Sequence, residues 1–283
     1  GRGHYLPHTA HRLSVKRRLR PKTVKLAAPG PLRDYVAAKL KKRWSPEQIA
    51  HRLRKDHPDE MEMRVCAETI YQAIYVHAKG ELKRELAASL RRGRRRRKPR
   101  KTAGQRTPRF VDEMVSISER PSDANDRVLP GHWEGDLIAG TQNRSAVATL
   151  VERSTRYVVL GHLPGDHGAA AVRESLVRAL KPLPEQLCRT LTWDQGAEMA
   201  EHKAFTVATD MDVYFCDPAS PWQRGTNENT NGLLRQYLPK GTDLRQFTLE
   251  QLALIAEELN GRPRKSLGWD TPAERIAALL EPA

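Results

Sequence analysis

One short segment of this chain cannot belong to a folded core. Residues 91–101 read RRGRRRRKPRK, so nine of eleven are Lys or Arg. Charges of one sign repel each other and lose hydration on burial, so such a run stays in water or lies against a polyanion. We expect a basic linker over residues 91–107 that neutralises DNA phosphates or enters a minor groove, the alternative being a merely solvated run. The four arginines at its centre are Arg94, Arg95, Arg96 and Arg97.

Charge is divided unevenly along the 283 residues. Residues 1–100 carry 28 basic and 9 acidic side chains, the rest of the chain carries 21 and 25, and the formal net charge is +15. Such asymmetry indicates a nucleic-acid-binding front end joined to a domain that is not a polycation. Residues 1–30 form a basic N-terminal segment. Because the chain starts at Gly1 without Met, we expect a further segment to precede it.

Composition excludes several other classes of protein. Hydrophobic residues make up 39% of the chain, enough to bury a core, which excludes wholesale disorder. No apolar run approaches the roughly 20 residues of a membrane helix and no signal peptide opens the chain, so we expect a soluble, cytoplasmic protein. The three cysteines are far apart, which argues against a disulfide framework or structural zinc. They are Cys66, Cys188 and Cys216.

Residues 31–90 have the pattern of three short helices. Apolar residues recur at three- and four-residue spacing over residues 32–40, which predicts the first helix. The sequence SPEQ at residues 45–48 combines an N-cap serine, a proline at the first helical position and a glutamine three residues after the cap. A third helix is predicted over residues 67–77. These helices indicate a helix-turn-helix DNA-binding domain, although the long connector at residues 57–64 leaves a generic helical bundle as the alternative.

The third helix is the candidate for reading DNA sequence. Ile70 and Ile74 should face the core, which leaves Glu68, Thr69 and Gln72 exposed near the helix N-terminus. A glutamine can pair bidentately with adenine, and a threonine methyl can contact thymine. The alternative is that this helix only packs, or contacts phosphate, while a preceding module reads the sequence.

From about Leu129 the pattern changes to short apolar runs rich in β-branched residues, separated by turn signals and followed by helical patterns. The predicted strands cover residues 132–139, 145–152, 157–163, 189–193 and 213–216, and the predicted helices cover residues 167–180 and 198–209. We therefore expect an α/β domain over residues 108–283, preceded by the all-α domain. Its mixed sheet flanked by helices has the order of elements of the ribonuclease H-like fold.

Three acidic residues lie where such a sheet would expose them. Asp136 lies in the first strand, Asp194 ends the fourth, and Glu228 lies in a helix, with 33 residues between Asp194 and Glu228. Clustered carboxylates repel each other unless divalent cations neutralise them, and oxygen ligands select Mg²⁺ or Mn²⁺. We expect the three to hold two such ions and to catalyse phosphodiester transfer. Taken singly, each acid has another explanation: Asp136 could be a charge at a strand edge, Asp194 could form a turn, and Glu228 could be a charge at a helix N-terminus that the helix dipole favours.

Neighbouring side chains extend the candidate site. Arg235 lies two helical turns after Glu228 on the same face, within reach of a DNA phosphate. Trp222 and Arg224, in the loop before that helix, are further candidate DNA contacts. The acids not expected to be primary ligands are Glu134, Glu198 and Asp217. The residues expected to be structural are Trp133, Trp193, His132, His202 and Cys216.

These motifs resemble the DDE transposases of bacterial insertion sequences, specifically the IS-thirty family. The resemblance in the second half rests on residues 131–138 (GHWEGDLI), 191–196 (LTWDQG), 220–243 (SPWQRGTNENTNGLLRQYLPKGTD) and 260–272 (NGRPRKSLGWDTP). In the first half, residues 44–53 (WSPEQIAHRL) and 68–75 (ETIYQAIY) are similar to the second helix-turn-helix of that family. Together, these stretches extend the resemblance over nearly the whole chain.

The resemblance implies that Asp136, Asp194 and Glu228 are the catalytic, metal-binding triad and that Arg235 is the basic residue expected after the glutamate. It implies Mg²⁺-dependent cleavage of the element's terminal inverted repeats and joining of the freed 3′-hydroxyl to target DNA, often through abutted or circularised ends. Because two ends must be held together, we expect a homodimer or larger synaptic assembly on double-stranded DNA, without a membrane.

The sequence departs from the family in two places. Members generally begin with a further helix-turn-helix that is absent here, so recognition of terminal repeats or target is expected to be incomplete. Cys66 stands where the family usually has an N-capping serine, and cysteine caps poorly. The alternatives to a transposase are a related integrase or nuclease, and a DNA-binding regulator with a silent catalytic domain, against which the intact triad argues.

Overall fold

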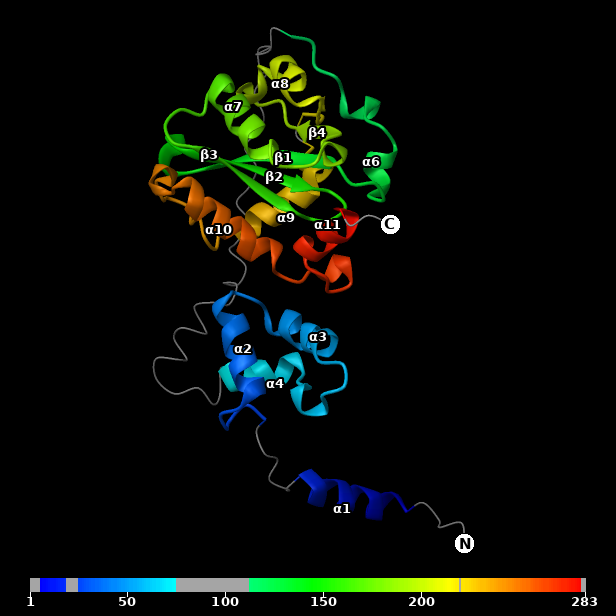
Figure 1. Cartoon of the computed structure of the whole chain (residues 1–283). Helices are drawn as coiled ribbons and strands as arrows, with labels where there is room; N and C mark the ends of the chain where they lie inside the picture. Colours follow the sequence, from blue (N-terminus) through cyan, green and yellow to red (C-terminus); the bar gives the residue numbers. More distant parts are fainter. Residues whose placement is uncertain (1–5, 19–24, 75–111, 219, 281–283) are drawn as a thin grey trace. The chain divides into compact units, whose positions relative to one another are not determined.

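The computed structural model describes residues 6–18, 25–74, 112–218 and 220–280, drawn in colour in Figure 1. The chain divides into two compact units, residues 1–90 and residues 91–283. The basic run predicted around Arg94 to Arg97 lies outside the described residues. Among the helices that are described, none is long and apolar enough to cross a membrane.

The described part of the first unit is helical. It contains α1 (Pro7–Arg18), α2 (Pro31–Lys41), α3 (Pro46–Asp56) and α4 (Ala67–Gln72). Apolar side chains of α2, α3 and α4 form one core, which includes Leu40, Ile49, Leu53 and Ile70. The helix α1 was not predicted, because its apolar residues have little periodicity; its described side chains contribute nothing to a core.

The starts of α3 and α4 differ as their N-cap residues predict. Ser45 Oγ accepts a hydrogen bond from the Gln48 backbone N–H at 3.2 Å, and Gln48 Oε1 accepts one from the Ser45 backbone N–H at 2.7 Å. This is the expected capping box. Cys66, in contrast, gives the N-terminus of α4 no side-chain cap. Between α3 and α4, Met63 and Val65 are buried in the core, so the connector is long because it packs.

The second unit is built on a mixed five-stranded sheet. Its strands are β1 (His132–Ala139), β2 (Ala146–Glu152), β3 (Val158–Leu163), β4 (Thr190–Trp193) and β5 (Asp212–Phe215). Their spatial order is β3-β2-β1-β4-β5, with antiparallel pairing on the β2 side of β1 and parallel pairing on the β4 side. Each strand lies within one residue of its predicted bounds, and the predicted α/β fold class is confirmed.

Helices cover both faces of this sheet (Figure 1). The described helices of this unit are α6 (Asp123–Asp126), α7 (Ala169–Leu180), α8 (His202–Thr209), α9 (Gly225–Leu234), α10 (Leu249–Asn260) and α11 (Pro272–Leu280). In Figure 1, α7 and α8 lie above the sheet, whereas α9 and α10 lie below it. Since both faces are covered, most side chains of the strands are buried, including the polar side chains of His132 and Glu134 in β1.

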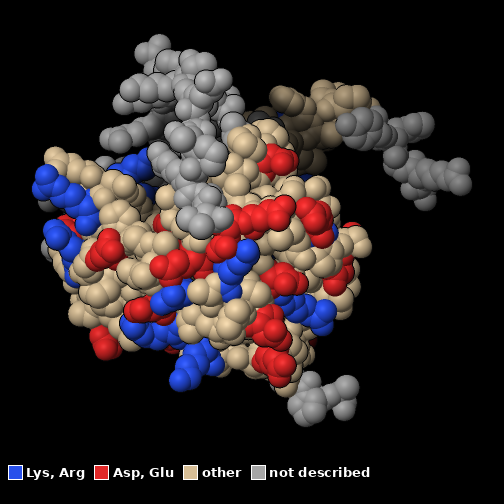
Figure 2. Space-filling model, turned by 90° about the horizontal axis from the view of Figure 1, so that it is seen from above, with Lys and Arg blue, Asp and Glu red and all other residues tan. Residues whose placement is uncertain are grey.

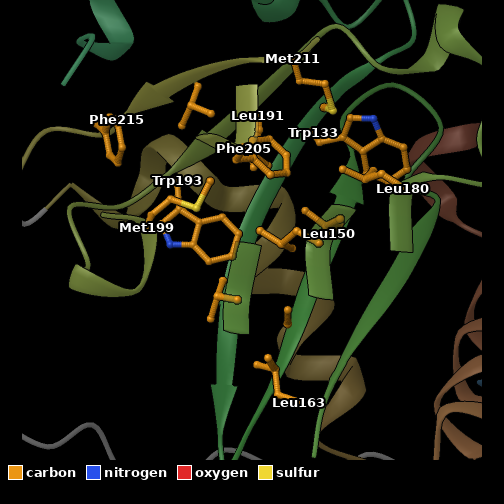
Figure 3. Packing of buried hydrophobic residues seen from close by; sticks show 14 of the residues in the cluster. Trp133, Leu150, Leu163, Leu180, Leu191, Trp193, Met199, Phe205, Met211 and Phe215 are labelled. Atoms are coloured by element: carbon orange, nitrogen blue, oxygen red, sulfur yellow. The ribbon is translucent and has the colours of Figure 1, made fainter. Parts of the chain in front are cut away.

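Two large tryptophans fill the core on the α7 side (Figure 3). Trp133 and Trp193 are fully buried, as expected, and pack with Leu150 and Phe205. A Cβ added to Gly135 would lie 2.1 Å from the Trp193 ring. This close approach requires a glycine directly before Asp136, and it explains why β1 and β4 carry a glycine and a tryptophan beside their acids.

Candidate active site

The parallel pairing of β1 and β4 brings two of the three predicted acids together. In this register Glu134 lies opposite Thr192. Asp136 and Asp194 are each two residues further along, so Asp136 within β1 comes to lie beside Asp194, which directly follows β4. Residues two apart point to the same face of a strand. The register of the sheet therefore makes neighbours of two aspartates that are distant in the sequence.

Arg224 bridges these two aspartates from the segment that enters α9. Its Nη1 lies 3.3 Å from Asp136 Oδ1, and its Nη2 donates a 3.0 Å hydrogen bond to Asp194 Oδ2. Its side chain is only 11% exposed. Burial alone would lower the pKa of Arg224, but the charges of Asp136 and Asp194 outweigh burial and raise that pKa. One guanidinium thus serves as the shared counterion of two carboxylates.

The remaining oxygens of the aspartates are also held in place. Asp136 Oδ1 accepts a 2.9 Å hydrogen bond from the backbone N–H of Leu137, and Asp136 Oδ2 accepts a 3.0 Å bond from Asn231 Nδ2. Asp194 Oδ1 accepts a 3.0 Å bond from the backbone N–H of Gly196. Burial raises the pKa of Asp136, the Arg224 charge opposes this rise, and the Asp194 charge adds to it.

Glu228 lies on the same flank of α9 but does not touch the aspartates. Arg224 precedes Glu228 by four residues and Asn231 follows it by three, and both contact Asp136. Residues three and four apart share one side of a helix, so Glu228 belongs to the side that faces the aspartates. Its side chain is exposed and makes no hydrogen bond or ion pair within the described residues.

The three predicted acids, Asp136, Asp194 and Glu228, therefore lie in one region, but their carboxylates are not arranged as a complete metal-binding site. Within the described ranges, no group of three or more His, Cys, Asp or Glu side chains is arranged to hold a metal ion. The cation between Asp136 and Asp194 is the guanidinium of Arg224. A divalent ion held by these two carboxylates would have to take over the place of that guanidinium.

A fourth carboxylate lies near the pair. Glu198 Oε1 accepts a 3.2 Å hydrogen bond from Trp193 Nε1. Burial raises the pKa of Glu198, and the charges of Asp194 and Asp136 raise it further. A Cβ on Gly196 would lie 2.0 Å from Glu198 Oε1, so the glycine leaves the space that this carboxyl fills. Glu198 was not expected to be a primary ligand, and in the structure it is hydrogen-bonded to Trp193.

A buried polar network fixes α9 on the sheet. Glu134 is fully buried; its Oε1 pairs with Arg153 Nη1 at 2.7 Å and its Oε2 accepts a 2.9 Å bond from the Asn227 backbone N–H. Asn227 Nδ2 also donates to the Glu134 carbonyl at 2.9 Å, and Thr149 Oγ1 donates to Asn227 Oδ1 at 3.1 Å. Asn227 and Arg153 were not predicted as site residues, because their role depends on contacts between segments that are distant in the sequence.

Two other predicted DNA contacts near α9, Arg235 and Trp222, differ in their surroundings, since Arg235 is hydrogen-bonded and Trp222 is exposed. Arg235 Nη2 donates to the Ala139 carbonyl at 3.1 Å and its Nη1 donates to the Leu238 carbonyl at 3.4 Å, so Arg235 ties the end of α9 to β1. Trp222 is 70% exposed. Asp217 accepts a 2.7 Å hydrogen bond from Gln223 Nε2, which stabilises the loop before α9.

In the first unit, the described part of the third helix has the expected faces. Ile70 and Ile74 are buried, Glu68 and Gln72 are exposed, and Thr69 is half-buried. Gln72 Nε2 donates a 3.1 Å hydrogen bond to Glu68 Oε1. The α-helix is described to Gln72, and residues 75–77 of the predicted helix lie outside the described residues.

The chain is similar to proteins of known families over nearly its whole length. The integrase core domain family matches residues 129–221. The transposase for insertion sequence element IS1086 of Cupriavidus metallidurans is 51% identical over 90% of this chain and 75% of that protein. Transposase InsI for insertion sequence element IS30A of Escherichia coli is 44% identical over 98% of this chain and 72% of that protein.

A more distant relative extends the same similarity. The transposase for insertion sequence element IS4351 of Bacteroides fragilis is 36% identical over 98% of this chain and 82% of that protein. All three relatives are insertion-sequence transposases, and the family matched by residues 129–221 includes Asp136 and Asp194 in its span. The chain therefore belongs to the IS30 family of insertion-sequence transposases and contains an integrase core domain.

Proposed function

We propose that this transposase binds the terminal inverted repeats of an insertion sequence, cleaves DNA at the element ends and joins the 3′-hydroxyl to target DNA. The observation that carries the proposal is the pairing of Asp136 and Asp194 on adjacent strands under one shared cation. Asp136, Asp194 and Glu228 are the catalytic residues of this proposal. A DNA-binding regulator would have no need to keep two half-buried carboxylates together at this point.

The residues present fit a divalent metal. Asp136 and Asp194 offer oxygen donors only, and their arrangement already requires a positive charge between them. Oxygen ligation selects Mg²⁺ or Mn²⁺. Asp136, Asp194 and Glu228 would hold the ions, of which we propose two. When bound, such ions activate an attacking oxygen and stabilise a leaving oxygen in phosphodiester transfer.

The chain's own residues position this site. Asn231 and the Leu137 backbone N–H orient the carboxylate of Asp136, and the Gly196 backbone N–H orients that of Asp194. Asn227 fixes the helix that carries Glu228 against the sheet. We propose that Trp222, Arg224 and Arg235 contact DNA beside the site, which for Arg224 and Arg235 requires giving up contacts described above.

We assign the other parts of the chain to DNA binding and linkage. In this proposal residues 1–30 are a basic segment, residues 31–90 a helix-turn-helix domain, residues 91–107 a basic linker and residues 108–283 the catalytic domain. Glu68, Thr69 and Gln72 read base edges, and Arg94 to Arg97 neutralise phosphates. Since two element ends must be joined, the protein acts as a homodimer or larger assembly, in the bacterial cytoplasm where its DNA lies.

A metal-dependent nicking assay tests this function. The substrate is a labelled duplex carrying the inverted repeats that flank the gene. The wild type should nick it in Mg²⁺ but not in EDTA, and Asp136→Asn and Asp194→Asn should bind the duplex normally without nicking it. Asp212→Asn, at the exposed start of β5, is the matched control and should nick normally. Binding without nicking by the wild type would instead establish the regulator.

A further inference from the structure

A cavity of about 230 Å³ lies on the other flank of α9. It is smaller than the roughly 300–1,000 Å³ of pockets for drug-sized ligands, and it has room for a small group with its water. Its walls come from four separate segments of the second unit. The lining side chains that matter here are Arg127, Arg156, Arg264, Thr226, Asn229 and Ser266. We call it the arginine cavity.

The arginine cavity is lined by positive charge and by hydrogen-bond donors. No acidic residue is among its described lining residues. Acidic and basic side chains are interspersed on the face of the molecule shown in Figure 2. The nearby acids are already engaged: Glu134 is bound by Arg153 and Asn227, and Glu152 Oε2 accepts 2.6 Å hydrogen bonds from the N–H and Oγ1 of Thr155. The cavity therefore has an excess of positive charge.

The guanidinium groups of Arg156 and Arg127 place positive charge at the wall of this cavity. Arg156 Nη1 donates a 2.5 Å hydrogen bond to Thr226 Oγ1, which fixes the guanidinium at the wall. Burial lowers the pKa of Arg156 and the charge of Arg127 lowers it further, whereas the charges of Glu134 and Glu152 oppose this change. Arg127 is exposed and makes no hydrogen bond or ion pair within the described residues. Like charges gathered in one cavity are stabilised when an anion enters between them.

The position of the arginine cavity relative to Asp136 and Asp194 follows from the rotation per residue along α9. Asn227 faces the sheet. Successive residues turn by about 100°, so Thr226 and Glu228 lie on opposite flanks of α9. Asn231, which contacts Asp136, shares the flank of Glu228, whereas Thr226 lines the cavity. The two sites are thus separated by about one helix diameter, roughly 10–12 Å.

We propose that the arginine cavity binds a backbone phosphate of the DNA substrate, on the side of α9 opposite to the cleavage site. This inference rests on the proposed function, because it supposes that DNA lies across α9. Each strand of a duplex advances about 3.4 Å along the DNA axis per base pair, so if the axis runs from one site to the other, about one helix diameter corresponds to roughly three nucleotides. The cavity would then hold the strand in register while the phosphate at Asp136 and Asp194 reacts.

The test combines Arg127→Gln with neutral phosphates. Duplexes carrying the inverted repeat are made with a single uncharged methylphosphonate at each position in turn, and their dissociation constants are measured with the full chain. Arg127→Gln should weaken binding of the unmodified duplex about five- to tenfold and reduce the salt slope by roughly 0.9, the value for one phosphate contact. At one position, about three nucleotides from the cleavage point, the methylphosphonate should weaken the wild type but not Arg127→Gln.

Arg178→Gln is the matched control, because Arg178 is an exposed arginine on α7, on the other face of the sheet. It removes the same charge and should leave both the affinity and the methylphosphonate profile unchanged. If Arg127→Gln binds like the wild type, or if its effect is additive with every methylphosphonate, the proposal is wrong.

Inorganic phosphate separates a DNA site from a site for free anions. If phosphate raises the Tm of the wild type but not of Arg127→Gln, while no methylphosphonate position is coupled to Arg127, the cavity binds free anions and the proposal fails. Failure of the proposed function is seen separately, as absence of Mg²⁺-dependent nicking by the wild type. The dissociation constants of the wild type and Arg127→Gln for the unmodified and methylphosphonate duplexes can be measured whether or not the protein nicks DNA.

Discussion

Arg224 donates a 3.0 Å hydrogen bond to Asp194, although the two residues are 30 positions apart in the sequence. The same guanidinium lies 3.3 Å from Asp136. Two carboxylates so close would repel each other without this charge. Arg224 therefore has the role in the metal-free protein that a divalent ion would have in the loaded one.

The first prediction concerns Arg224→Gln. Without Mg²⁺ the variant should be less stable than the wild type by about 1–2 kcal/mol, which lies between the roughly 0.2–1 kcal/mol of an exposed ion pair and the roughly 3–5 kcal/mol lost when a buried pair is broken, because Asp194 is 42% exposed and water screens its charge. Mg²⁺ no longer competes with the guanidinium, so it should raise the Tm of the variant more than that of the wild type. Thermal unfolding at a series of Mg²⁺ concentrations measures both effects.

Arg245→Gln is the control for this experiment. Arg245 pairs with Asp243 on the surface, away from the aspartates of the site, so its loss should leave the response to Mg²⁺ unchanged. An equal Mg²⁺ response in Arg224→Gln and the wild type would show that Arg224 does not compete with the metal.

The second prediction decides between two glutamates. Glu228→Gln should reduce nicking by about a hundredfold or more, because it removes an anionic ligand that contributes several kcal/mol. Glu198→Gln should retain most of the activity, since Glu198 accepts the Trp193 indole N–H and an amide oxygen can accept the same bond. Single-turnover nicking and titration with Mn²⁺ measure activity and ion binding. The reverse order of effects would make Glu198 the third ligand.

The third prediction concerns a buried histidine. His132 is buried, its Nδ1 lies 2.9 Å from Thr190 Oγ1, and its Nε2 lies 3.6 Å from Asp123 Oδ1. Burial lowers the pKa of His132 below the ordinary 6.5; Asp123 and Glu152 oppose this, whereas Arg189 and Arg120 add to it. The unfolded chain then binds the proton more readily than the folded one. The free energy of unfolding should fall as the pH drops below about 6.5 and level off below the folded pKa.

Urea denaturation at pH values between about 5 and 8 measures this dependence. His132→Asn keeps a polar group near Thr190 but has no proton to take up, so the part of the slope that His132 contributes should disappear. His167→Asn, at the partly exposed segment before α7, is the control and should keep the wild-type slope. A His132→Asn slope equal to that of the wild type would contradict the assignment.

The fourth prediction concerns the glycine before Asp136. In Gly135→Ala the new Cβ would lie 2.1 Å from the Trp193 ring, so β1 or the indole must move. Overpacking of this kind costs typically 1–3 kcal/mol. Gly232→Ala is the opposite case, because a Cβ added there in α9 would have no described atom within 4 Å apart from neighbouring residues and the backbone of its own helix, and it should stabilise the protein by about 0.5–1 kcal/mol. Denaturant unfolding of both variants measures whether the free energy of unfolding falls in Gly135→Ala and rises in Gly232→Ala.

The fifth prediction concerns the exposed face of α4. Gln72→Ala should relax the preference for one or two bases of the terminal repeat, each by about 1–3 kcal/mol, while non-specific affinity stays nearly constant. Binding to a library of single-base variants measures the profile. Glu62→Ala, in the exposed connector, is the control. An unchanged profile in both Gln72→Ala and Thr69→Ala would show that this helix does not read sequence.

The sequence by itself determined the five strands and the class of the fold, whereas the helices α1, α10 and α11 were not predicted. Short apolar runs rich in β-branched residues, separated by turn signals, defined all five strands within one residue, because a sheet covered on both faces buries most of its side chains. The capping box at Ser45 was likewise readable, because a cap is a local interaction between residues three apart. The family could be identified from the same motifs, since they retain the acids with their glycines and tryptophans.

Only the tertiary structure decided how the acids are held. The sequence placed Arg224 among the DNA contacts, whereas the parallel register of β1 and β4 and the entry of α9 put its guanidinium between Asp136 and Asp194. Asn227 and the arginine cavity at Arg127 depend in the same way on segments brought together by folding. Periodicity and capping reflect neighbours along the chain, whereas a shared counterion depends on distances between segments that no local pattern encodes.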